Sequence, residues 1–90
     1  MPRYLIEREL PGAGKLSASE LQAIAAKSNE VLAGMGGRAK WVESFVSEDA
    51  ITCVYLADSP EDLREHAIDG GFPLTAIREV TQVIDPTTAD

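Results

Sequence analysis

Two runs of β-branched and aromatic residues, at 40–46 and 50–56, flank a polar stretch at 47–49. This composition is typical of a strand, a turn and a second strand, so we predict a β-hairpin over 40–56. Because side chains alternate along a strand, Trp41, Glu43 and Phe45 are expected to share one face. Val42 and Val46 are then assigned to the other face, toward the helices.

The predicted face of Trp41, Glu43 and Phe45 holds a carboxylate between two aromatic rings. Burial in a core would require a partner for the Glu43 charge, and full exposure would leave two large rings in water. Coverage by a second copy of the chain satisfies both conditions. We therefore expect this face to be a dimer surface.

The N-terminal third predicts a strand followed by a helix. Residues 3–10 alternate in the manner of a strand, and the Pro and Gly residues of 11–14 end it. A helix is expected next, beginning at Ser17 with Glu20, or at Ser19 with Gln22, since both pairs match a capping box. The apolar stripe of this helix follows helical spacing. Its members are Leu21, Ile24, Ala25, Ser28, Val31, Leu32 and Met35.

The segment after the hairpin predicts a second helix and a last strand. Ser59 is a suitable N-cap and Pro60 suits the first helical position. Leu63, His66 and Ala67 are expected to face inward, and the glycines at 70–71 end the helix. Residues 76–84 predict the final strand, and 85–90 are expected to be a flexible tail.

The resulting order, β-α-β-β-α-β, is that of a ferredoxin-like α+β fold. We predict one domain over 1–84, with a four-stranded antiparallel sheet and two helices on one face. The other face would be open, and its coverage by a second subunit would give a dimeric α+β barrel.

Composition narrows the possible partners. The net charge is −7, and the eight Lys and Arg residues are scattered, which argues against nucleic acid. No apolar run approaches the roughly 20 residues of a membrane span, and the N-terminus lacks the pattern of a secretory signal, so we expect a cytoplasmic protein that does not bind membranes. The lone Cys53 is expected to be a small buried hydrophobe.

Asp62, His66 and Asp69 fall at spacings that place them along one edge of the second predicted helix. An imidazole flanked by carboxylates can hold a divalent cation, which makes these three residues candidate metal ligands. The alternative remains open that the acidic residues are solvated and that the His66 ring is partly buried beside Leu63 and Ala67.

Glu7 and Glu43 are expected to point into the same covered space, where two chains would double them. They could bind a cation, or they could form structural ion pairs with nearby basic residues. A second possibility is a small-ligand or cofactor-free enzymatic pocket, with Glu43 or Glu7 as base and Trp41 and Tyr55 as walls. Packing at an interface is the alternative for the two aromatic residues. No nucleophile lies beside a base in the sequence, and an enzymatic role is therefore left open without being favoured.

Five runs are informative together. They are PRYLIER (2–8), WVESFVSED (41–49), CVY (53–55), SPEDLREHA (59–67) and GFPLTAIREV (71–80). In this order and spacing they resemble a family of short bacterial proteins of unknown function that includes a nickel-binding protein with a dimeric ferredoxin-like fold. The resemblance extends over residues 3–80.

The resemblance implies a homodimer that binds nickel or another divalent cation, with sequestration as one use. The chain departs from the family pattern at two positions, with Glu43 where members often have His and Phe45 where they usually have Tyr. A carboxylate favours harder ions than imidazole does, so the change at Glu43 bears directly on nickel binding. A non-enzymatic metal-binding protein is the leading hypothesis.

Overall fold

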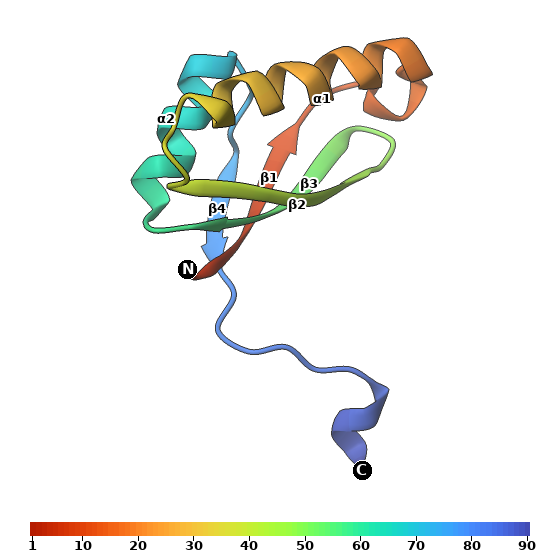
Figure 1. Ribbon diagram of the computed structural model, residues 1–90. Coiled ribbons are helices and arrows are strands. Elements are labelled where there is room, and N and C mark those ends of the chain that lie inside the picture. The colour runs from red at the N-terminus through yellow and green to blue at the C-terminus, as the bar shows by residue number, and fades with distance from the viewer.

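The computed structural model describes residues 1–90, which form a four-stranded antiparallel sheet and two α-helices (Figure 1). Two short 3-10 helices, Ala13–Lys15 and Pro86–Ala89, complete the chain. Neither α-helix is long and apolar enough to cross a membrane. The main elements are β1 (Arg3–Glu9), α1 (Ala18–Ala33), β2 (Ala39–Val46), β3 (Ala50–Ala57), α2 (Pro60–Gly70) and β4 (Ala76–Glu79).

The sheet has the strand order β2-β3-β1-β4, which confirms the predicted ferredoxin-like α+β fold. The helices pack on one side of the strands (Figure 1). Side chains alternate strictly along β1 and β3, so that every second residue enters the core. The core includes Tyr4, Ile6, Cys53, Tyr55 and Leu63.

The helix ends follow the predicted capping chemistry closely. The Ser17 and Glu20 side chains form a reciprocal capping box with each other's backbone amides, which selects the first of the two predicted starts. Pro60 begins α2, and Gly71 ends it with φ +68, a conformation that favours glycine. The Ser59 side chain makes no capping bond and donates instead to Asp62 at 3.1 Å.

The predicted facing of β2 is wrong at Trp41. Val42 is an extra residue in a β-bulge, because Trp41 pairs with Tyr55 while Glu43 pairs with the adjacent Val54. The bulge reverses the parity of every residue before it. Trp41 therefore lies on the helix face with Tyr55, whereas Glu43 and Phe45 remain on the open face.

The last strand is also shorter than predicted: it spans Ala76–Glu79 rather than 76–84. It pairs with β1, and the final bond of the pair runs from the Val80 amide to the Arg3 carbonyl at 2.8 Å. Since β1 begins at Arg3, the chain beyond Val80 has no strand to pair with. It extends away from the body of the domain (Figure 1) and ends in the 3-10 helix at Pro86–Ala89. The flexibility of 85–90 stays a prediction.

Candidate functional site: a cavity beneath the first helix

A cavity of about 630 Å³ lies between α1 and the sheet. It exists because α1 covers the sheet incompletely: Ser28 is its only buried residue. Hydrophobic side chains make up 11 of the 18 lining residues. Leu21 and Ile24 line it from the helix, and Trp41, Ile51 and Tyr55 line it from the strands. Its size and apolar lining are typical of sites for small organic ligands.

Three polar side chains form a chain of hydrogen bonds at this cavity. The Ser28 hydroxyl lies 3.2 Å from the Tyr55 hydroxyl and 3.1 Å from Nε2 of His66. The Ser28 and Tyr55 side chains belong to the lining, and His66 is fully buried behind them. Burial raises the pKa of the Tyr55 hydroxyl, so Tyr55 stays protonated and can donate.

His66 is neutral at physiological pH. Burial, reinforced by the nearby positive charge of Arg8, lowers its pKa to about 4. Its ring lies 5.3 Å from that of Tyr55 and 5.1 Å from that of Phe72, measured between centroids. Nδ1 of His66 is buried without a hydrogen-bond partner. The ring therefore completes a tightly enclosed aromatic cluster.

Arg8 is an unusual lining residue, because its side chain is charged and yet only 5% of the residue is exposed. Nη1 donates to the Pro73 carbonyl at 2.7 Å, and the guanidinium lies 5.4 Å from the centre of the Phe72 ring. Nη2 is buried with no partner. The ion pairs of the protein join other residues, so the buried charge of Arg8 has no carboxylate beside it.

The turn after α2 holds Phe72 in place over Arg8. A Cβ on Gly70 would approach Cε2 of Phe72 to 2.2 Å, so the absence of a side chain there lets the ring lie against the backbone. The left-handed conformation of Gly71 then reverses the chain. These two glycines thus build one wall of the cavity in addition to ending the helix.

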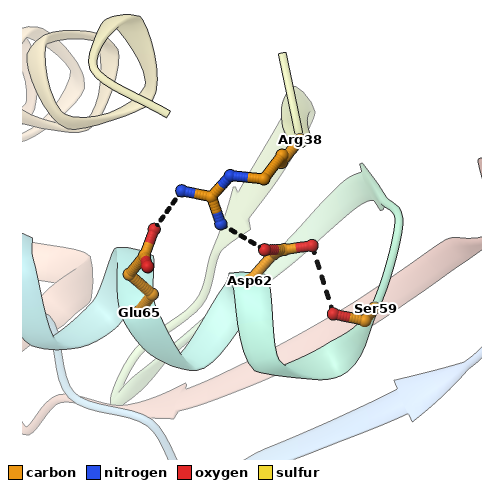
Figure 2. A network of polar contacts seen from close by, with 4 residues as sticks. All are labelled: Arg38, Ser59, Asp62 and Glu65. Carbon is orange, nitrogen blue, oxygen red and sulfur yellow. Dashed lines mark hydrogen bonds and ion pairs between the residues drawn. The ribbon is translucent and has the colours of Figure 1, made fainter. Parts of the chain in front are cut away.

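The predicted metal ligands of α2 turn in different directions. Asp62 accepts hydrogen bonds from Arg38 and from Ser59, and Arg38 also bonds Glu65 at 2.6 Å (Figure 2). The ion pair with Arg38 neutralises the charge of Asp62. His66 points inward to Ser28, and Asp69 is exposed. Nowhere in the chain do three His, Cys, Asp or Glu side chains gather as a group that could hold a metal ion.

Glu7 and Glu43 both lie on the open face of the sheet, on strands separated by β3. Glu7 forms an ion pair with Arg78 at 2.8 Å, and Glu43 is exposed. Trp41 and Tyr55 lie on the opposite face and line the cavity. The sheet therefore separates the four residues that the sequence combined into one pocket.

Sequence reasoning missed three lining residues of the cavity, Arg8, Ser28 and Phe72. Arg8 alternates with Tyr4 and Ile6, and this pattern already placed a charge on the face that proved to be the core. Ser28 fell within the apolar stripe of α1, which was a second signal. Phe72 carried none, since its position depends on how the turn after α2 folds back.

Fold and cavity together define a small ferredoxin-like α+β protein with a ligand-sized space between its sheet and first helix. Comparison with known families is more specific. Residues 4–80 match the family described as nickel responsive protein SCO4226-like, and the chain belongs to that family. The match confirms the resemblance stated above.

A solved structure shares this fold. The crystal structure of SCO4226 from Streptomyces coelicolor A3(2) superposes with a TM-score of 0.77 over 91% of this chain and 99% of that chain. The two sequences are 13% identical, so the likeness concerns the fold. A comparison with curated proteins finds no match.

Proposed function

We propose that the protein is a non-enzymatic divalent-metal-binding protein, that its ion is nickel, and that it binds the ion as a homodimer. The observation that carries this proposal is membership of a family described as nickel responsive, over a match that spans nearly the whole folded region. Nickel binding by this chain would then be one way in which such a protein responds to nickel.

The donor set of a single chain does not fit a nickel site, because no three suitable side chains converge. Asp62 is paired with Arg38, and Nε2 of His66 is engaged by Ser28. The proposal therefore places the ion between two chains. Glu7 and Glu43 are its candidate ligands, because their carboxylates lie on an open surface where a two-fold axis would double each of them. Oxygen ligands are harder than imidazole, so we expect weak discrimination between nickel and other divalent ions.

The open face of the sheet offers apolar area for a homodimer. Phe45 is 56% exposed and Leu5 is 36% exposed, and both share the face with Glu7 and Glu43. A domain of this size has a small core, so burial of an apolar sheet face against a second copy would add to its stability.

Calorimetric titration of Ni²⁺, Co²⁺ and Zn²⁺ tests the proposal. We expect heat of binding with the wild-type protein and a loss of affinity of about tenfold or more in Glu43→Gln, since a charged ligand is removed. Glu61→Gln is the matched control, because Glu61 is an exposed carboxylate on α2. Sedimentation with and without Ni²⁺ reports the dimer. Absence of heat with every ion, or equal loss in both variants, would contradict the proposal.

The alternative of a pocket with Glu43 or Glu7 as a base receives no support from the geometry. Both carboxylates lie on the face of the sheet opposite the cavity that Trp41 and Tyr55 line. The cavity itself holds a different polar group, Arg8, which leads to a separate inference.

A further inference from the structure

Arg8 is the strongest unexplained feature of the molecule. A guanidinium has five N–H donors and keeps its charge at all accessible pH values, so burial without an anion is costly. In this protein the Pro73 carbonyl accepts one bond from the group, the Phe72 ring and the Tyr55 hydroxyl lie near it, and Nη2 has no hydrogen-bond partner. A buried donor that lacks a partner indicates a group still to be supplied.

The surroundings of Arg8 define what that group must be. The side chain lines the cavity of about 630 Å³ beneath α1, whose other walls are mainly hydrophobic. No ion pair neutralises Arg8, and the two titratable side chains near it, His66 and Tyr55, are both uncharged at neutral pH. A ligand with an apolar body and one anionic end would match both features, because guanidinium and carboxylate form short, charge-assisted hydrogen bonds.

We propose that this cavity binds a small organic carboxylate with an aliphatic or aromatic body, whose carboxylate accepts hydrogen bonds from Arg8 while its body packs between α1 and the sheet. Ile24 and Leu21 cover the body from the helix, and Trp41 and Ile51 contact it from the strands. The hydroxyls of Ser28, on α1, and Tyr55, on β3, also line the cavity and are further donors. This site lies on the opposite face of the sheet from Glu7 and Glu43, so the proposal does not depend on nickel binding.

The contacts of Arg8 explain how the folded chain tolerates a buried guanidinium that has no carboxylate partner. Phe72 stacks on the guanidinium and the Pro73 carbonyl accepts one bond, so part of the cost of burial is offset before a ligand arrives. The turn at 70–73 that supplies both groups also belongs to the cavity wall. The site is thus held in shape in advance, which lowers the entropic cost of binding.

The test compares decanoate with decan-1-ol, two ligands with the same body and different head groups. Trp41 is the only tryptophan and lines the cavity, so its fluorescence reports binding of either ligand to the full chain. We expect wild-type protein to bind decanoate about 10- to 100-fold more tightly than decan-1-ol, the difference a charged hydrogen bond makes. This comparison needs no variant, so it stands whether or not variants fold. Equal affinity for the two ligands would overturn the proposal.

Arg8→Met removes the charge and keeps an unbranched side chain that replaces the aliphatic part of the arginine. We expect it to lose the preference for decanoate and to keep its affinity for decan-1-ol. Arg64→Met is the matched control, because Arg64 is an exposed arginine on α2 outside the cavity lining, and it should bind both ligands as the wild type does. Retained preference in Arg8→Met, or equal loss of preference in Arg64→Met, would show that Arg8 is not the anchor.

A cavity-filling variant, Ile24→Phe, locates the site by a second route and leaves Trp41 as the only tryptophan. The larger side chain on α1 should weaken binding of decanoate and of decan-1-ol alike. Decanoate binding to Ile24→Phe with the affinity of the wild type would place the ligand elsewhere and refute the proposal.

Discussion

Arg8 and Arg78 lie in the same sheet, on neighbouring strands and on opposite faces, and their charges are handled in opposite ways. The Arg78 side chain is 59% exposed and pairs with Glu7. Arg8 is 5% exposed and has no carboxylate partner. The paired arginine lies where pairing contributes little, and the unpaired one lies where a partner would contribute most.

These two arginines mark the two faces of the sheet, to which we assign two different proposed activities. The open face carries exposed carboxylates and apolar side chains, which suit an interface and a shared cation. The helix face carries a buried cation and an apolar cavity, which suit an organic anion. Because one sheet divides the two faces, each proposed activity can be tested by mutation without changing the residues of the other.

Alanine substitutions at Ile6 and Leu5 should show the largest difference in stability between the two faces of the sheet. Ile6 is fully buried on the helix face, and Ile6→Ala should lower the free energy of unfolding by about 2 to 5 kcal/mol, from lost burial and the cavity it leaves. Its neighbour Leu5 points to the open face, and Leu5→Ala should cost less than about 1 kcal/mol in the isolated chain. Urea denaturation at low protein concentration measures both.

Sedimentation of the same two variants extends the comparison to the proposed dimer. If the open face is an interface, Leu5→Ala should weaken association more than its effect on folding predicts. Equal stability losses at the two positions would show that the two faces are not as different as their burial indicates.

The next largest expected effect is a pH dependence of the free energy of unfolding, which results from the burial of His66. The unfolded chain binds a proton at this residue with a pKa near 6.5, and the folded chain does so only near 4. Between these values the unfolded state holds more protons, so stability is lost as pH falls. The expected loss between pH 7 and pH 5 is about 2 kcal/mol.

Chemical denaturation at the two pH values, with His66→Gln as reference, isolates this term, because glutamine does not titrate. The reference variant should be nearly insensitive over the same range. If the wild-type protein is equally stable at pH 7 and pH 5, protonation of His66 does not lower the free energy of unfolding, and the prediction from its burial is wrong.

Replacement of Arg38 and of Arg78 tests the value of an ion pair, and Arg78→Ala is the smallest change in stability that we expect. Arg38→Ala leaves the largely buried Asp62 with only the Ser59 hydroxyl, and should cost about 1 to 3 kcal/mol. Arg78→Ala breaks an exposed pair with Glu7 and should change stability by no more than about 0.5 kcal/mol. Thermal unfolding compares the two directly, and a larger loss in Arg78→Ala would reverse the contrast.

The order and type of the elements could be predicted from the sequence because they depend on local chemistry. The Ser17 and Glu20 capping box, the proline at 60 and the glycine at 71 fix helix ends through backbone bonds and dihedral preferences that involve only near neighbours. Alternation along β1 and β3 likewise needs no distant partner. Together with the resemblance, these features were enough for the ferredoxin-like fold.

The candidate site depended on tertiary structure. The bulge at Val42 moved Trp41 from the predicted open face to the cavity, and nothing in the local sequence of β2 distinguishes a bulged strand from a regular one. Helical spacing placed Asp62, His66 and Asp69 together, yet Arg38, 24 residues before Asp62, drew the carboxylate away from the imidazole. The sequence by itself therefore determined which elements form and in what order. Only the packing of the helices on the sheet decided where Arg8 is buried without a partner, because burial and pairing depend on residues that are distant along the chain.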